Sequence, residues 1–281
     1  MDLKNMLDNV IEQGKANIKT NEGDYIGENG LLYCGNCHTP KQIVVEIPEL
    51  GIKRKPLCLC KCGEEKRDAE EAERKRLEFE RKTKDLRQSG FPESDMHKWN
   101  FANDDMENPK ITKAMQNYVD NFADLRKEGK GILLHGSVGT GKTFAACEVA
   151  NALIDKGYPV LVTNFARIIN TLQGMFEKQD YIDSLNRFSL LVIDDLGIER
   201  DTPFAREQVY NIIDSRYRAG LPMIITTNLS IEKIKNPDDI ENKRIYDRVL
   251  EKCFPIEMSG GSRRRKAIRE GYNDMKDLLG L

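Results

Sequence analysis

Two features that identify whole classes of protein are missing from this sequence: a long apolar run and an excess of charge of one sign. No apolar run approaches the length needed to span a membrane, and the first residues lack the apolar core of a signal peptide. Among 281 residues, 44 Lys and Arg are offset by 46 Asp and Glu, for a net charge of −2. Overall charge therefore indicates no strong affinity for nucleic acid, so any such site must be local. We expect a cytoplasmic protein that does not contact membranes.

A disulfide framework is not expected either, because disulfides are rare in the reducing cytoplasm. Five of the seven cysteines lie close together: Cys34, Cys37, Cys58, Cys60 and Cys62. Two residues separate Cys34 from Cys37, so both thiolates can face one metal, and tetrahedral Zn²⁺ needs four such ligands. We favour Cys34, Cys37, Cys60 and Cys62, with Cys58 as the alternative to Cys60 and His38 as a weaker candidate. Redox-active cysteines and an iron–sulfur cluster are the competing interpretations.

The most informative stretch is residues 136–143, which have the pattern of a phosphate-binding loop. An apolar run at 131–135 precedes it, as a buried strand requires, and residues 144–153 have helical spacing. The loop consists of Gly136, Ser137, Val138, Gly139, Thr140, Gly141, Lys142 and Thr143. In such a loop, backbone N–H groups and the helix N-terminus hold the phosphates. Lys142 can then reach the β- and γ-phosphates of ATP, and Thr143 can offer its hydroxyl to Mg²⁺.

A second signal is the apolar run at 188–193, which ends in Asp194 and Asp195. A strand buried on both faces is continuously apolar, and acids at its carboxyl end face the crevice where parallel sheets bind ligands. We expect Asp194 to hold Mg²⁺ through water, and Asp195 to orient or deprotonate the attacking water. Alone, this acid pair would favour an ordinary turn after a strand; after a phosphate loop at this spacing, it favours an ATPase.

Composition divides the chain into three parts. We predict an N-terminal helix and zinc module at 1–63, a charged helical linker at 64–90, and a nucleotide-binding domain at 91–281. The linker mixes charges of both signs and has almost no apolar stripe, which is typical of a solvated helix. Helical patterns in the last part separate five candidate strands, at 131–135, 159–163, 189–193, 223–227 and 254–258. This alternation predicts an α/β fold, with a parallel sheet covered by helices on both faces.

Taken together, four motifs resemble the AAA+ family, and within it the DnaC/DnaI helicase-loader group, to which the transposition helper IstB is closely related. These motifs are the phosphate loop, Leu-Leu-Val-Ile-Asp-Asp-Leu-Gly at 190–197, Ile-Ile-Thr-Thr-Asn-Leu at 224–229, and Arg-Ile-Tyr-Asp-Arg-Val at 244–249. The resemblance implies a bacterial or phage-encoded protein whose five-stranded parallel sheet lies between helices. The cysteine module resembles the zinc-binding domain of loaders, which IstB-like helpers are not expected to carry.

The resemblance also implies catalytic roles. Asn228 matches the sensor 1 position, where an amide holds the attacking water near the γ-phosphate. Arg248 matches the arginine finger, which would reach the ATP of a neighbouring subunit, and Arg244 is the alternative. Many AAA+ ATPases have Glu where this chain has Asp195. Aspartate is one methylene shorter, so we expect slow hydrolysis, which Glu199 could assist.

Three adjacent arginines resemble the sensor 2 segment, which contacts bound nucleotide. Arg264 is the best match, and Arg263 and Arg265 are close rivals. These arginines also form the strongest local basic patch, whose alternative role is contact with DNA phosphates. The residues that bind adenine are not readable; the segment around Phe101 is expected from its position only.

The resemblance implies an ATP-dependent loader of a hexameric, DnaB-type replicative helicase onto single-stranded DNA, with ATP, Mg²⁺ and Zn²⁺ as cofactors. The zinc module would grip the helicase, and the ATPase domains would self-assemble in an ATP-dependent manner. Two alternatives remain. One is an IstB-like transposition helper that acts with a transposase on duplex DNA, and the other is a nucleotide-gated DNA-binding adaptor with little turnover.

Overall fold

The structure, a computed structural model, describes residues 20–197 and 202–263, together with positions 268, 272, 275, 276, 278 and 279. The helix expected at the N-terminus falls on residues 1–19, outside the described residues. The chain divides into two compact units, Met1–Phe79 and Glu80–Leu281. No helix in the described part is both long enough and apolar enough to cross a membrane.

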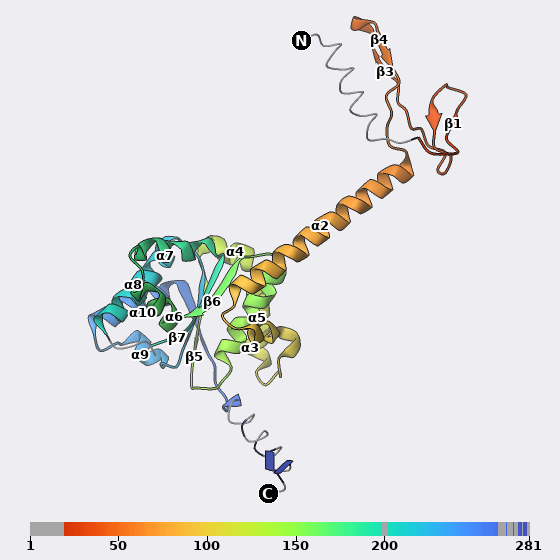
Figure 1. The fold of residues 1–281 in the computed structure, drawn as a ribbon. Coiled ribbons are helices and arrows are strands. Elements are labelled where there is room, and N and C mark those ends of the chain that lie inside the picture. The colour runs from red at the N-terminus through yellow and green to blue at the C-terminus, as the bar shows by residue number, and fades with distance from the viewer. Residues whose placement is uncertain are drawn as a thin grey trace. The chain divides into compact units, whose positions relative to one another are not determined.

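The first unit is built from two small antiparallel hairpins (Figure 1). Its strands are β1 (Tyr25–Ile26) paired with β2 (Leu32–Tyr33), and β3 (Val45–Ile47) paired with β4 (Ile52–Arg54). The short helix η1 (Pro48–Leu50) and Gly51, which has a φ of 60°, connect β3 to β4. The buried apolar side chains described in this unit are Cys34, Ile52 and Cys60. So few buried side chains cannot stabilise a fold by themselves, and small modules of this kind need a metal or disulfide staple.

The charged segment forms the long helix α2 (Lys61–Gly90), in which most residues are exposed. Ion pairs three or four residues apart lie along it: Lys66–Glu70, Glu71–Lys75, Glu73–Arg76 and Arg74–Glu78. Each exposed pair of this kind contributes only about 0.3–0.5 kcal/mol. At the carboxyl end, in the second unit, Arg87 donates a 2.7 Å hydrogen bond to the side-chain oxygen of Asn151.

The second unit contains the predicted five-stranded parallel sheet, in the order β6-β7-β8-β5-β9. Its strands are β5 (Gly131–His135), β6 (Val160–Asn164), β7 (Leu190–Leu196), β8 (Met223–Thr227) and β9 (Cys253–Glu257). All four pairings are parallel, so the α/β prediction is confirmed. The carboxyl ends of the strands therefore meet at one edge, where ligands of such sheets bind.

Helices cover both faces of this sheet (Figure 1). One face carries α3 (Pro109–Asp120), α4 (Phe122–Glu128) and α5 (Lys142–Asp155). The other carries α6 (Phe165–Gln173), α7 (Lys178–Ser184), α8 (Pro203–Arg218), α9 (Ile231–Lys235) and α10 (Ile240–Lys252). The short helices η2 (Ser94–Lys98), η3 (Phe101–Asn103) and η4 (Leu185–Arg187) lie in the connections. Successive side chains along a strand point to opposite faces, so the sheet has one hydrophobic core on each face. Leu190 and Val192 of β7 face α5, whereas Leu191 and Ile193 face α6 and α8.

A buried arginine organises the opposite edge of the sheet. Arg216 is 1% exposed, and its guanidinium donates to the carbonyl oxygens of Leu185, Phe188, Ser189 and Pro222. These carbonyls lie in the segments that lead into β7 and β8. Arg216 thereby fixes the starting points of the two strands that carry the candidate catalytic residues at their other ends.

Candidate functional site

The phosphate loop connects β5 to α5 through glycines that no other residue could replace without strain. Gly136, Gly139 and Gly141 have φ values of 139°, 86° and 92°, in the region that L residues avoid. A Cβ on Gly136 would lie 2.4 Å from the carbonyl oxygen of Met258, and one on Gly139 would lie 2.2 Å from Ser262 Oγ. The loop is thus shaped by its own glycines and by the segment after β9.

Lys142 and Thr143 begin α5, at the end of the loop. The Lys142 side chain is buried, and its Nζ donates to the carbonyl oxygens of Gly136 and Ser137 at 2.9 and 2.7 Å. The Thr143 hydroxyl donates to Asp194 at 3.0 Å. An ammonium group, a hydroxyl and the partial positive charge of a helix N-terminus therefore converge where phosphates and Mg²⁺ would lie.

Asp194 and Asp195 lie near the carboxyl end of β7, and a threonine holds both of them. The Thr226 hydroxyl donates to Asp194 Oδ1 at 2.5 Å and accepts the backbone N–H of Asp195 at 3.0 Å. Burial raises the pKa of Asp194 above its ordinary range, and a bound cation would favour the charged form that burial disfavours. Sequence reasoning missed Thr226, although it belongs to the 224–229 motif.

The pairing of β7 with β8 is irregular between Ile193 and Leu196, and within this irregularity Asp195 has a φ of 63°. A positive φ is costly for a residue with a side chain and is often retained at functional sites. Asp195 lines a cavity of about 500 Å³ at the carboxyl edge of the sheet. Asn228, directly after β8, lines it too, as do Lys142 and Thr143.

Other residues lining this cavity had no predicted role: Trp99, Asn103, Asp105 and Phe144. The Trp99 ring lies 6.1 Å from that of Phe144. Trp99 and Asn103 flank Phe101, where the sequence suggested the base-binding segment. Trp99, Asn103 and Asp105 come from the connection before α3, so no local motif marks them, whereas Phe144 lies in α5 directly after the phosphate loop.

The other predicted site residues do not all lie at this cavity. Arg264, Arg265 and Glu199 lie outside the described residues. Arg263, the rival to Arg264, lines the cavity. Arg248 does not line it: on α10 it forms a 2.7 Å ion pair with Asp214 and donates to the Tyr210 hydroxyl at 2.9 Å.

Glu148, on α5, is 2% exposed. Its Oε1 has no hydrogen-bond partner among the described residues. Burial, and secondarily the charge of Asp104, raise its pKa to about 8. The carboxyl is therefore mostly protonated at neutral pH, which limits the cost of burying it.

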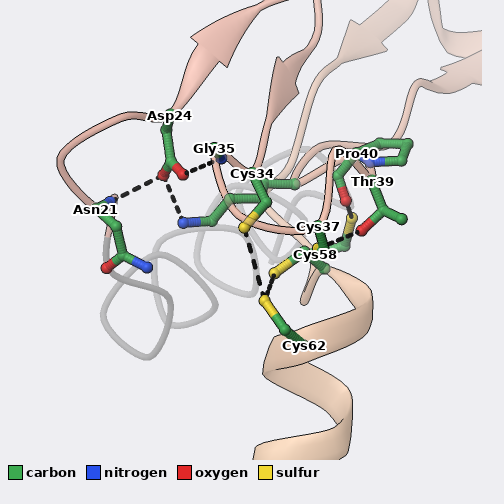
Figure 2. Close-up of polar contacts among 11 residues, drawn as sticks. Asn21, Asp24, Cys34, Gly35, Cys37, Thr39, Pro40, Cys58 and Cys62 are labelled. Carbon is green, nitrogen blue, oxygen red and sulfur yellow. Dashed lines mark hydrogen bonds and ion pairs between the residues drawn. The ribbon is translucent and has the colours of Figure 1, made fainter.

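In the first unit, four cysteines form one cluster (Figure 2). The sulfur atoms of Cys34, Cys37, Cys60 and Cys62 all lie within 4.8 Å of one another, and Cys62 Sγ lies 3.6 and 3.4 Å from those of Cys34 and Cys60. Zn–S bonds of about 2.3 Å in a tetrahedron require sulfur separations of about 3.8 Å. The cluster therefore fits Zn²⁺.

Neither of the other candidate ligands belongs to this cluster. Cys58 Sγ instead lies 3.7 Å from the carbonyl oxygen of Pro40 (Figure 2). His38 Nδ1 lies 3.3 Å from the Tyr25 hydroxyl. The structure thus groups the four cysteines that the sequence analysis favoured.

The surroundings of the sulfur atoms also suit a cation. Hydrogen bonding from Thr39 and from backbone N–H groups lowers the pKa of Cys37 to about 5. The neighbouring sulfurs of Cys60, Cys37 and Cys34 raise the pKa of Cys62 to about 12. Four thiolates this close can coexist only when a cation offsets their charge.

A buried ion pair braces the loop that holds Cys34 and Cys37 (Figure 2). Lys41 Nζ lies 2.6 Å from Asp24 Oδ2, and each side chain is 4% exposed. The other carboxylate oxygen of Asp24 accepts the backbone N–H of Gly35 at 3.2 Å. Sequence reasoning missed this pair, because nothing in the local pattern links residue 24 to residue 41.

Comparison with known proteins decides the family. A family model described as IstB-like ATP binding protein matches residues 66–271. The chain belongs to the IstB-like ATP-binding protein family. The matched range contains the phosphate loop and the cavity residues, whereas the cysteine cluster precedes it.

Relatives of this IstB-like chain carry two kinds of name. It is 25% identical over 206 residues to the replicative helicase loader DnaI of Bacillus subtilis (strain 168), covering 68% of this chain and 66% of that protein. It is 27% identical over 164 residues to a Mycobacterium tuberculosis (strain ATCC 25618 / H37Rv) protein named as an ATP-binding protein in insertion sequence, covering 56% of this chain and 64% of that protein. Less than two thirds of either relative is matched.

The fold of this IstB-like chain is similar to a crystal structure of DnaI, with a TM-score of 0.52 at 23% sequence identity. That match covers 63% of this chain and 98% of the solved chain. The similarity confirms the predicted AAA+-type architecture.

Proposed function

We propose that this chain is an ATPase that loads a hexameric, DnaB-type replicative helicase onto single-stranded DNA. One observation supports the ATPase part above all: Lys142, Thr143, Asp195 and Asn228 line a single cavity. Together they supply what is needed to bind a triphosphate, hold Mg²⁺ and position water. The similarity to DnaI and the cysteine cluster ahead of the family-matched region support the helicase-loading part.

In the proposed reaction, the loop amides and Lys142 bind phosphate oxygens, while Thr143 and Asp194 hold Mg²⁺. Bound Mg²⁺ neutralises charge on the phosphates. Asp195 orients the attacking water and accepts its proton, and Asn228 holds that water near the γ-phosphate. The short side chain of Asp195 makes hydrolysis slow.

Between subunits, Arg248 would act on the ATP of a neighbouring copy. Its guanidinium would exchange its bond to Asp214 for the charge that develops on the γ-phosphate. ATP binding would hold the copies together on helicase and DNA, and hydrolysis, stimulated by DNA, would release them. The cysteine cluster with its Zn²⁺ would stabilise the module that grips the helicase.

A second candidate function is that of a transposition helper acting with a transposase on duplex DNA. The name of the M. tuberculosis relative favours it. The two functions differ in the nucleic acid and the partner, so one experiment separates them.

The test is a loading assay with the purified full chain, the hexameric helicase from its source, and circular DNA. We expect helicase to remain on single-stranded circles only when both the chain and ATP are present. A Lys142→Ala variant should abolish loading and lower ATP hydrolysis about 100-fold or more. Lys127→Ala removes an exposed lysine that does not line the cavity and serves as the matched control.

The outcomes are distinct. Stronger stimulation of hydrolysis by duplex than by single-stranded DNA, with no helicase loaded, would favour the transposition helper. ATP binding without measurable turnover would favour the nucleotide-gated adaptor. Full activity of Lys142→Ala would refute every ATP-dependent function.

A further inference from the structure

Arg263 lies where the segment after β9 meets the phosphate loop. Its backbone N–H donates to the carbonyl oxygen of Gly139 at 2.9 Å. Its guanidinium packs against Gly141, with Cζ 3.1 Å from where a Cβ on that glycine would lie. The side chain is 23% exposed and lines the same cavity as Lys142 and Thr143. It therefore lies beside the cavity in which a bound triphosphate would sit.

Three carboxylates from one short segment surround this guanidinium. Asp105 Oδ1 lies 3.2 Å from Nη2, Glu107 Oε2 lies 3.7 Å from Nε, and Asp104 Oδ1 lies 3.8 Å from Nη1. Asp104 is fixed in place, since its side chain is 3% exposed and it accepts a hydrogen bond from the Thr112 hydroxyl. The segment 104–107 and the segment after β9 are thus tied together through one arginine.

This arrangement has more negative charge than is needed to orient Arg263. One carboxylate would be enough to fix the guanidinium, whereas three place further negative charge beside a cavity suited to phosphates. The excess charge opposes nucleotide binding in two ways. The carboxylates occupy the guanidinium N–H donors of Arg263 that would otherwise bind the phosphates, and they repel the phosphates directly.

We propose that Asp104, Asp105 and Glu107 set the nucleotide affinity of this site by competing with the triphosphate for Arg263. The inference rests on the proposed binding of ATP. When ATP enters, the guanidinium turns from the carboxylates to the phosphates. The tie between segment 104–107 and the segment after β9 then loosens.

The test is the dissociation constant of ATP for the full chain, measured by calorimetry and by the fluorescence of Trp99, the single tryptophan of the sequence, which lines the cavity. Asp105→Asn should bind ATP about three- to tenfold more tightly, from the loss of one charge at the cavity edge. The gain should shrink at high salt, because the charge is partly exposed. Asp105→Glu keeps the charge and should not reproduce this gain in affinity.

Two further variants separate competition from other effects. In an Arg263→Gln background, Asp105→Asn should tighten binding no more than about twofold, because only the repulsion remains to be removed. Asp95→Asn removes an exposed carboxylate paired with Lys98 and should leave the affinity unchanged.

Unchanged or weaker ATP binding by Asp105→Asn would overturn the proposal. Tighter binding would support it, and misfolding of the variant could not produce that result. If the unaltered chain binds no ATP, the proposed function itself fails. If that chain binds ATP and the variant gains nothing, only the inference about the carboxylates fails.

Discussion

Glu148 is a buried acid that should weaken the fold as the pH rises. Burial raises its pKa from the ordinary 4.5 to about 8, and Oε1 has no hydrogen-bond partner among the described residues. Below pH 4.5 the carboxyl is protonated in both states, so the free energy of unfolding loses nothing there. Above that pH the unfolded chain releases its proton while the folded chain keeps it, so stability falls until about pH 8.

The size of this effect follows from the pKa difference. Each pKa unit corresponds to about 1.4 kcal/mol, so the group costs the folded state about 1 kcal/mol at pH 5 and about 4 kcal/mol at pH 8. Glu148→Gln replaces the carboxyl with a neutral group of the same shape. Its stability relative to the unaltered chain should therefore rise by about 3 kcal/mol between pH 5 and pH 8.

Urea unfolding of the full chain at pH 5, 6, 7 and 8, followed by Trp99 fluorescence, measures this difference. Glu207→Gln removes an exposed carboxylate on α8 and serves as the control, with a constant difference across the range. A pH-independent difference for Glu148→Gln would show that Glu148 is charged in the folded state. That result would refute the reasoning from burial.

The remaining predictions concern the metal centre and the sheet. Metal analysis of the purified protein should find about one zinc per chain, lost in Cys60→Ser but kept in Cys58→Ser; zinc lost from both variants would contradict the observed cluster. Arg216→Met should lower the free energy of unfolding by about 3–5 kcal/mol in urea titrations, because it leaves buried carbonyls unpaired. Gly131→Ala should lower the melting temperature markedly, because its Cβ would lie 1.9 Å from the carbonyl oxygen of Met223; an unchanged value would mean that β5 and β8 separate at little cost.

Local sequence patterns predicted the parts of this protein that depend on near neighbours in the chain. The glycine pattern at 136–143 requires the backbone turn found between β5 and α5. The apolar run ending at Asp194 and Asp195 had to be a buried strand, and its acids had to face the carboxyl edge of a parallel sheet. Five such runs separated by helical patterns predicted the sheet, and the structure confirmed it.

Side chains that approach from remote segments were not predictable in this way. Trp99 and Asp105 reach the cavity from a connection without a motif. Thr226 on β8 donates a hydrogen bond to Asp194 on the neighbouring strand β7. The pairing of Asp24 with Lys41 joins positions that have no common pattern.

The sequence by itself determined the phosphate loop, the acid pair, the parallel sheet and the presence of a cysteine cluster. Each of these depends on backbone geometry or periodicity within a few residues. Only the tertiary structure decided which cysteines come together. Five cysteines were candidates for four ligand positions, and the direction of each side chain depends on the packing of the hairpins. It also decided which charges meet at the cavity. Arg263 and Asp105 are brought together only when the chain has folded around the sheet.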